Sequence, residues 1–268
     1  MIDGSICIVG LGLLGGSLAR ALVARGNRVI AVEPDVSVRS LALAEGVVAE
    51  AHADLGPAMA RAELVILCAP VPAIEQLLGP VSQVMSDGAI LTDVAGVKRA
   101  VLEAARAVRP GVRFVGAHPM FGGERGGFGA SRADVFVGGT VAVCDDGADE
   151  RAIARVVALY ESLGSKVVRC TADEHDAAVA KISHLPYVLA HAAFDASGVS
   201  HDVLARTLAG PGFRSATRLA GFAFEVQGEV ALRNAHLPGA IDALIERLQA
   251  VKAALGDPAE ARSLLRKK

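Results

Sequence analysis

The sequence predicts an α/β fold: an N-terminal, doubly wound parallel sheet of the Rossmann type, followed by an all-helical C-terminal domain. Up to about residue 170, short β-branched runs alternate with Ala-, Leu- and Arg-rich segments of helical character. The runs show no polar alternation, which is typical of strands covered on both faces. After Cys170, apolar residues recur at helical spacing instead. We therefore expect two domains, residues 1–170 and residues 171–268.

Seven strands are expected in the first domain, all in the parallel sheet, at residues 5–10, 27–33, 62–69, 88–95, 113–118, 139–145 and 165–170. Thr171 and Asp173 are candidate N-caps for the first helix of the second domain, and Gly198 is a candidate stop signal.

Composition excludes several classes of function. With 52% hydrophobic and 21% charged residues the chain is an ordinary globular protein, and its formal net charge of -2 offers no field for a nucleic acid. The apolar N-terminal run is broken by glycines and lacks a basic leader, so we expect neither a signal peptide nor a membrane segment. The four widely spaced cysteines suit reduced thiols in the cytoplasm and no metal site.

A dinucleotide-binding motif follows the first expected strand. Gly10, Gly12 and Gly15 form G-x-G-x-x-G, and the helix that begins at Leu13 and Leu14 directs its N-terminal N–H groups toward a pyrophosphate. In this motif the first glycine permits the tight turn, the second the approach of the phosphates, and the third close packing of helix and sheet.

The second expected strand ends at Glu33, about twenty residues after the motif, where an acid binds the ribose hydroxyls of NAD. A carboxylate there repels a 2′-phosphate, so the expected cofactor is NAD. NADP stays open, because Arg39 lies close enough in sequence to assist that phosphate. Pro70, in a Pro-x-Pro turn, is expected at the carboxyl end of another strand and thus in the same pocket.

The segments GLGLLGGSLA, TDVAGVK, GAHPMFGGERGG, DEHDAAVAKISHLPYVLAHA and ATRLA occur in the order and at the spacing of the prephenate/arogenate dehydrogenase family, which the sequence resembles over almost its whole length. The resemblance implies oxidation of a cyclohexadienyl dicarboxylate by NAD(P), with loss of CO2, in tyrosine biosynthesis. It also implies a homodimer. Apolar residues on more than one face of the C-terminal helices point to dimerisation through that domain.

His118 matches the catalytic histidine of the family. It lies in GAHPMFGGERGGFG, residues 116–129, a segment with six glycines that we expect to wrap the nicotinamide and the substrate ring. Histidine suits the acceptance of a hydroxyl proton near neutrality, and we expect turnover to rise with pH through an apparent pKa near the usual one for histidine.

The resemblance also implies substrate-binding residues. Arg218 matches a carboxylate-binding arginine, and Ser183 and His184 match positions that line the substrate pocket. The neighbouring pair His175 and Asp176 recurs in the family pattern, but we interpret it as orienting helices and place it outside the site.

Three departures from the family pattern bear on the substrate. Gly96 replaces a serine that would assist the histidine, Tyr187 replaces a second histidine, and Arg214 stands near a position where relatives often carry lysine. Arg214 could bind a second carboxylate and so favour prephenate. Arogenate and 4-amino-4-deoxyprephenate stay open as substrates.

Two alternative functions for a chain with this motif are a β-hydroxyacid dehydrogenase and a non-catalytic NAD-sensing module. A β-hydroxyacid dehydrogenase would carry asparagine four residues after Lys181, where Leu185 stands instead. A non-catalytic NAD-sensing module would need no base beside the nicotinamide, and His118 argues against it. We expect neither a chorismate mutase segment nor a β-rich regulatory module.

Overall fold

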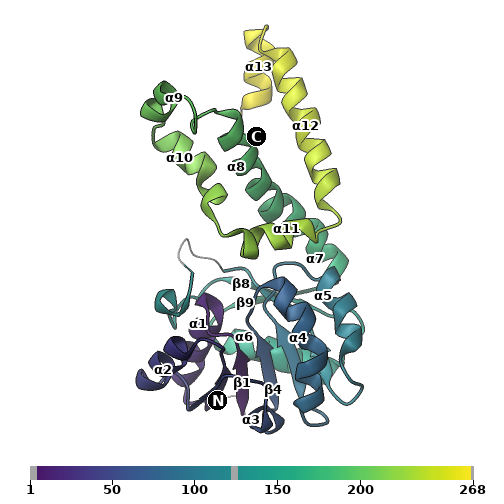
Figure 1. Ribbon diagram of the computed structural model, residues 1–268. Helices are drawn as coiled ribbons and strands as arrows, with labels where there is room; N and C mark the ends of the chain where they lie inside the picture. The colour runs from purple at the N-terminus through teal and green to yellow at the C-terminus, as the bar shows by residue number, and fades with distance from the viewer. Residues whose placement is uncertain (1–4, 122–125, 267–268) are drawn as a thin grey trace.

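The computed structural model describes residues 5–121 and 126–266. Figure 1 shows two parts stacked on each other: an α/β domain that contains the N-terminus, and a helical domain above it, which α7 (Ala172–Val179) enters from the sheet region. The residues of interest for chemistry gather where these two parts meet.

The main sheet has six parallel strands in the order β3-β2-β1-β4-β5-β6. Their bounds are β1 Ile6–Val9, β2 Val29–Val32, β3 Glu50–His52, β4 Leu64–Leu67, β5 Ile90–Asp93 and β6 Arg113–Val115. Alternate side chains of β1 point to opposite faces: Ile6 and Ile8 belong to one core cluster, Cys7 and Val9 to another. Both faces are therefore buried, as the absence of polar alternation predicts.

Helices cover both faces of this sheet. On one face lie α1 (Leu13–Val23) and α6 (Glu150–Ser162); on the other lie α4 (Val71–Val84) and α5 (Arg99–Ala104). The shorter elements are α2 (Val36–Ala44), α3 (Pro57–Ala60), η1 (Ala105–Ala107) and η2 (Phe128–Ala130). This is the doubly wound arrangement expected from the sequence, and it brings the carboxyl ends of the strands to the edge that faces the helical domain (Figure 1).

The prediction of one parallel sheet with seven strands is wrong in its later part. The strand expected at residues 113–118 divides at Gly116 into β6 and β7 (Ala117–Pro119). β7 pairs antiparallel with β8 (Thr140–Cys144), and β8 pairs parallel with β9 (Lys166–Cys170), in a separate three-stranded sheet. The short polar edge strand β3 was not expected, because its residues carry no apolar run.

The N-cap of α7 is Thr171, one of the two candidates from the sequence, and its side chain forms a capping box with Glu174. One π-helical turn, η3 (Ala180–His184), separates α7 from α8 (Leu185–Ala196). Pro186 lies in the first turn of α8, and its missing N–H explains why the α-helical hydrogen bonds are interrupted here. Gly198, with a φ of 67°, follows the end of α8.

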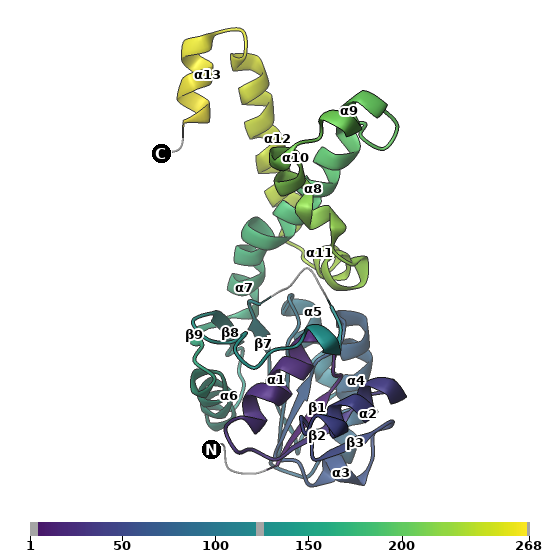
Figure 2. The same cartoon turned by 90° about the vertical axis from the view of Figure 1, so that its left-hand side faces the viewer.

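The remaining helices are α9 (Val203–Leu208), α10 (Pro211–Thr217), η4 (Arg218–Gly221), η5 (Phe224–Gly228), α11 (Glu229–Leu232), α12 (Leu237–Ala254) and α13 (Pro258–Leu265). Figure 2 shows α12 and α13 extending away from the α/β domain.

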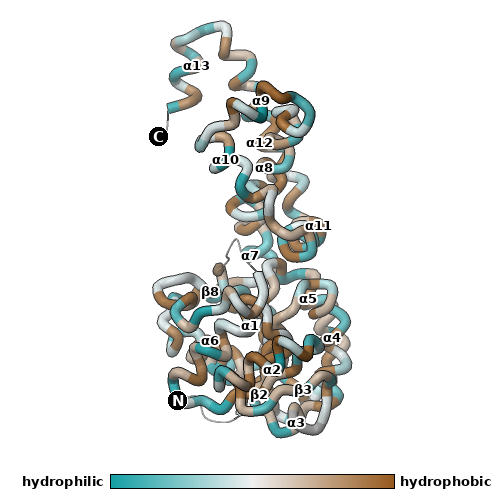
Figure 3. Tube along the Cα trace, turned by 60° about the vertical axis from the view of Figure 1, so that its left-hand side comes forward, coloured by the Kyte–Doolittle hydropathy of each residue, from teal (hydrophilic) through white to brown (hydrophobic). Residues whose placement is uncertain are grey.

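The core of the helical domain is small, with Tyr187, Ala231 and Leu237 as its buried members. Many large apolar side chains of this domain are instead exposed, and brown segments mark its helices in Figure 3. They include Ile182, Val203, Leu204, Leu208, Phe224, Val226, Leu232, Ile245, Leu248, Leu255 and Leu265. None of the described helices is both long and apolar enough to cross a membrane.

Candidate active site

The glycine motif forms the tight turn between β1 and α1. Gly10 has a φ of 93°, and a β-carbon there would overlap the carbonyl oxygen of Cys68. A β-carbon on Gly15 would overlap the carbonyl oxygen of Gly10. Gly12, which precedes Leu13 and Leu14 at the start of α1, differs, because a β-carbon there would meet nothing within 4 Å. The open space lies at a helix N-terminus, where the pyrophosphate of a dinucleotide binds.

Glu33 lies directly after β2 and beside this turn. Its carboxylate accepts hydrogen bonds from the backbone N–H of Leu11 at 2.7 Å and of Asp35 at 3.0 Å. Arg39 donates to the carbonyl oxygens of Glu33 at 2.6 Å and Pro34 at 2.8 Å. The guanidinium is thus partly committed to the backbone, while the Glu33 carboxylate lies at the position expected to bind the ribose. Pro70 caps α4 at the carboxyl end of β4, as predicted.

His118 is on β7, and a buried ion pair holds that strand to β5. Lys98 and Asp93 have no exposed side-chain surface and form this pair. The Lys98 ammonium also donates to the carbonyl oxygen of Ala117 at 2.7 Å, and Asp93 accepts from the N–H of Ala117 at 3.1 Å. The N–H and carbonyl groups of Ala117, the residue before His118, are therefore both held in place by this ion pair.

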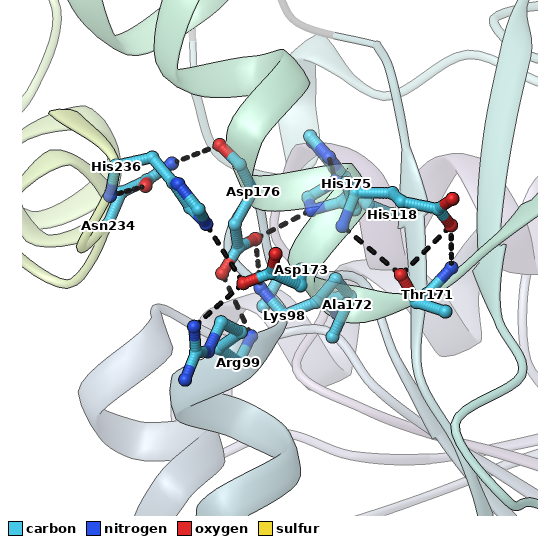
Figure 4. Close-up of polar contacts among 12 residues, drawn as sticks. Lys98, Arg99, His118, Thr171, Ala172, Asp173, His175, Asp176, Asn234 and His236 are labelled. Carbon is cyan, nitrogen blue, oxygen red and sulfur yellow. Dashed lines mark hydrogen bonds and ion pairs between the residues drawn. The ribbon is translucent and has the colours of Figure 1, made fainter. Parts of the chain in front are cut away.

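His118 contacts His175, a residue of the first helix of the helical domain, and His175 in turn contacts Asp176. Its Nδ1 lies 2.8 Å from Nε2 of His175, and Nδ1 of His175 lies 2.7 Å from Oδ1 of Asp176 (Figure 4). The pKa of His118 is held well below its usual range, first by burial and then by the charges of His175, Lys98 and His184. The neutral imidazole is therefore the stable form near pH 7.

His184 and Gly96 complete this cluster. A β-carbon on Gly96 would lie 3.5 Å from Nε2 of His118 and 3.1 Å from Cγ1 of Val230. His184, almost fully buried, accepts from the side-chain amide of Asn234 at 2.9 Å and also hydrogen-bonds to the backbone of Gly96. Burial lowers the pKa of His184 to about 4. His118 and His184, both with a lowered pKa, thus lie next to the backbone of Gly96.

Comparison with known proteins identifies the family. Residues 18–169 match the nucleotide-binding domain of prephenate dehydrogenase, and residues 171–266 match its dimerization domain. The chain belongs to the prephenate dehydrogenase family. The predicted family, the fold class and the assignment as an enzyme are confirmed, as is a nucleotide-binding domain, whose match begins at residue 18, shortly after the glycine motif.

Individual members of the family are similar over most of their length. A cyclohexadienyl dehydrogenase from Zymomonas mobilis is 32% identical over 237 residues, which cover 86% of this chain and 80% of that protein. An arogenate dehydrogenase from Synechocystis is 32% identical, with 97% and 96% of the two chains covered and a TM-score of 0.83. A prephenate dehydrogenase from Aquifex aeolicus, solved with hydroxyphenyl propionate and NAD+, shares the fold at 24% identity, with 97% and 93% covered and a TM-score of 0.89.

The other residues matched to this prephenate dehydrogenase family lie at varying distances from His118. Ser183 is half-buried beside His184 on η3, and Tyr187 is buried one turn further along, with its ring 4.7 Å from that of His191. Arg214 is exposed and donates to the carbonyl oxygen of Ala209 at 2.7 Å. Arg218 is exposed on η4, with its guanidinium 5.6 Å from the Phe222 ring. The structure brings Gly96 and His184 to His118, whereas Arg214 and Arg218 lie on α10 and η4.

The sequence interpretation missed three residues of this cluster. His175 and Asp176 were set aside as helix-orienting residues, yet His175 contacts the His118 ring directly. Asn234, which bridges His184 and the carbonyl oxygen of Asp176, was not considered. In the sequence, Asn234 is marked only as a lone amide in an apolar helical stretch. The adjacent histidine and acid in DEHDA, by contrast, could have been recognised as a hydrogen-bonded pair acting on a catalytic residue.

Part of the predicted glycine-rich loop lies outside the described residues. Residues 122–125, which include two of its glycines, belong to that part, so the proposed wrapping of the nicotinamide and substrate rests on the sequence. Among the residues that are described, no group of three or more His, Cys, Asp or Glu side chains could hold a metal ion.

Proposed function

We propose that this chain catalyses the NAD-dependent oxidative decarboxylation of prephenate to 4-hydroxyphenylpyruvate, a step of tyrosine biosynthesis, with His118 as the proton acceptor. The observation that carries the proposal is the placement of His118: burial and nearby charges hold its pKa well below the usual range, its Nδ1 is engaged by His175, and its Nε2 lies 3.5 Å from the place of a β-carbon on Gly96. Within residues 5–121 and 126–266, Nε2 makes no hydrogen bond of its own.

The chemistry requires one acceptor at the ring hydroxyl. Bound NAD supplies the hydride acceptor for the carbinol carbon. His118 Nε2 accepts the hydrogen bond of the hydroxyl and takes its proton as that carbon is oxidised. Loss of the ring carboxylate as CO2 makes the ring aromatic, and the proton on His118 can return to the same oxygen, which becomes the phenol. The histidine thus ends each cycle neutral.

NAD is the proposed cofactor because of the residues around the glycine turn. The space at Gly12 admits a pyrophosphate, and the Glu33 carboxylate is suited to the two ribose hydroxyls but repels a 2′-phosphate. Arg39 is the residue that could assist the 2′-phosphate of NADP. Its guanidinium instead donates hydrogen bonds to two backbone carbonyl oxygens. We assign residues 1–170 to cofactor binding and residues 171–268 to substrate binding and dimerisation.

The two exposed arginines support a dicarboxylate substrate. Arg214 and Arg218 lie on consecutive short helices, α10 and η4 respectively, and η4 packs against α8, which carries Tyr187. A guanidinium binds a carboxylate through two parallel hydrogen bonds, so we propose Arg218 for one carboxylate of prephenate and Arg214 for the other. Ser183, His184 and Tyr187 would line the space between them and His118.

Arogenate is the second candidate substrate, and one observation favours it. Burial, followed by the negative charge of Glu225, raises the pKa of Tyr187. That carboxylate could pair with the side-chain ammonium that arogenate has and prephenate lacks. The amino analogue 4-amino-4-deoxyprephenate differs at the ring instead, at the group proposed to face His118.

Initial rates of NADH formation with prephenate, arogenate and 4-amino-4-deoxyprephenate test the proposal. We expect the highest kcat/KM with prephenate; a higher value with arogenate would replace prephenate by the second candidate. His118→Asn should abolish most turnover and leave NAD affinity unchanged, whereas His201→Asn, at an exposed position before α9, should change neither. Turnover that survives in His118→Asn would refute the role of this histidine.

Arg218 is tested separately. Arg218→Ala should raise the KM for prephenate strongly with a smaller effect on kcat, and Arg218→Lys should recover only part of the affinity, since an ammonium lacks the planar pair of donors. An unchanged KM in Arg218→Ala would remove this residue from the substrate site.

The assembly we propose is a cytoplasmic homodimer formed through the helical domain. The exposed apolar side chains of that domain and its match to the family's dimerization domain support it. The four free cysteines suit a reducing compartment. Sedimentation at micromolar concentration measures the mass, and a monomer would contradict the proposal.

A further inference from the structure

Three side chains from the two domains form a continuous row. Asp176 and His175 are adjacent on α7, the first helix of the helical domain, and His118 is on β7 of the α/β domain. The links are 2.7 Å from Asp176 Oδ1 to His175 Nδ1 and 2.8 Å from His175 Nε2 to His118 Nδ1 (Figure 4). The two imidazole rings meet edge to face, with an interplanar angle of 76°.

Asp176 is a fixed anion at one end of the row. It is almost fully buried, and burial alone would raise its pKa, but hydrogen bonds from His175 and from the backbone N–H groups of Arg99 and Lys98 lower the pKa overall. Those N–H groups donate at 2.9 Å and 2.8 Å, at the start of α5. An ionised carboxylate only accepts hydrogen bonds, so Nδ1 of His175 must carry the proton that is donated to it.

This proton fixes the remaining ones in turn. A neutral histidine with its proton on Nδ1 has an unprotonated Nε2, which can only accept. When His175 is neutral, the group facing its Nε2, which is Nδ1 of His118, is therefore the donor, and the lone pair of His118 is placed on Nε2. Gly96, the neighbour of that atom, has no side chain that could perform the same task.

We propose that His175 and Asp176 are positioning residues, which hold His118 in the tautomer and orientation that present the Nε2 lone pair to the substrate hydroxyl. The inference rests on the proposed function of His118. It also means that the acceptor is correctly set only when α7 is docked against β7, because two members of the row come from the helical domain.

Two substitutions at His175 separate its two contacts. The amide of asparagine reaches the place of Nδ1, so His175→Asn keeps a donor for Asp176 and removes the acceptor for His118. The amide of glutamine reaches the place of Nε2, so His175→Gln restores an acceptor for His118. We expect kcat to fall roughly 10²-fold in His175→Asn and to stay within about tenfold of wild type in His175→Gln, with NAD affinity unchanged in both.

The tautomer can be observed without turnover. In protein labelled with ¹⁵N-histidine, long-range proton–nitrogen correlations distinguish protonated from unprotonated ring nitrogens; His118→Asn and His175→Asn identify the two signals. We expect Nε2 of His118 to be unprotonated in the wild type. Oδ1 of Asp176 also accepts from the N–H of Lys98, so in Asp176→Asn the amide carbonyl should occupy the Oδ1 place and both tautomers should stay as in the wild type.

The outcomes of these experiments distinguish failure of the inference from failure of the proposed function. A wild-type His118 protonated on Nε2, or a His175→Asn variant with wild-type kcat, overturns the inference. If His118→Asn itself retains turnover, the proposed function fails first. If His118→Asn is inactive while both His175 variants match the wild type, only the relay is refuted. Should Asp176→Asn unfold, because Asp176 also holds the start of α5, the His175 pair still gives the answer.

Discussion

Lys98 and Asp93 form an ion pair that is entirely buried beneath the strand carrying His118. Besides the ion pair, Asp93 accepts from the N–H groups of Ala95 and Ala117, and Lys98 donates to the carbonyl oxygen of Ala117. A buried pair is a weak contributor to stability as a whole, but removal of one partner leaves an uncompensated charge. The pair therefore fixes the position of β7 relative to β5.

Lys98→Met should lower the free energy of unfolding by about 3–5 kcal/mol, since Asp93 is left charged and buried. Adding Asp93→Asn in the same chain should recover part of this loss. Urea unfolding with and without the second substitution measures both effects. The control is Arg106→Met at an exposed pair with Glu103, expected to cost less than about 1 kcal/mol. Equal losses for Lys98→Met and Arg106→Met would contradict the interpretation.

Gly12 and Gly15 should respond differently to alanine. Gly15→Ala places a methyl group on the carbonyl oxygen of Gly10 and should cost about 3 kcal/mol of stability. Gly12→Ala meets no protein atom and should cost no more than about 1 kcal/mol, yet reduce NAD affinity at least roughly tenfold because it occupies the space assigned to the pyrophosphate. Thermal unfolding measures the loss of stability in each variant, and NAD titration measures the change in affinity. Wild-type NAD affinity in Gly12→Ala would argue against this site.

The pH dependence should differ from the expectation based on the sequence. Because burial and the charges of His175, Lys98 and His184 lower the pKa of His118, the neutral acceptor persists below pH 6.5. Activity is present above the pKa of His118 in the folded enzyme and is lost as the pH falls through it. The acid limb of kcat/KM should therefore lie well below the usual pKa of histidine. An acid limb centred at about 6.5 would contradict the shift.

Gly96 and Val230 should be coupled. A serine β-carbon at position 96 would lie 3.1 Å from Cγ1 of Val230, so Gly96→Ser should lower stability by about 1–3 kcal/mol through overpacking. In the Gly96→Ser, Val230→Ala double variant this penalty should shrink, which a double-mutant cycle of unfolding free energies measures. Strictly additive effects would show that Val230 does not occupy the space of the missing serine.

Several parts of the site are determined by contiguous sequence. The turn at Gly10, the close packing at Gly15, the position of Glu33 and the cap at Thr171 all depend on a strand, a turn and a helix that follow one another directly. The geometry of such units depends on local backbone conformation and hydrogen bonding. These features could be predicted, and so could the change from an α/β to a helical domain.

Tertiary structure alone decided how His118 is held. His118 and His175 are 57 positions apart, and Asn234 is 50 positions from His184. Their contacts depend on the break at Gly116, which moves β7 into the second sheet, and on the docking of α7 against that sheet. The pattern of residues along one chain reports which face of an element is buried, but not which distant face it meets. The sequence by itself therefore determined the family, the nucleotide turn and the candidate histidine, whereas packing between two domains decided which neighbours set its proton.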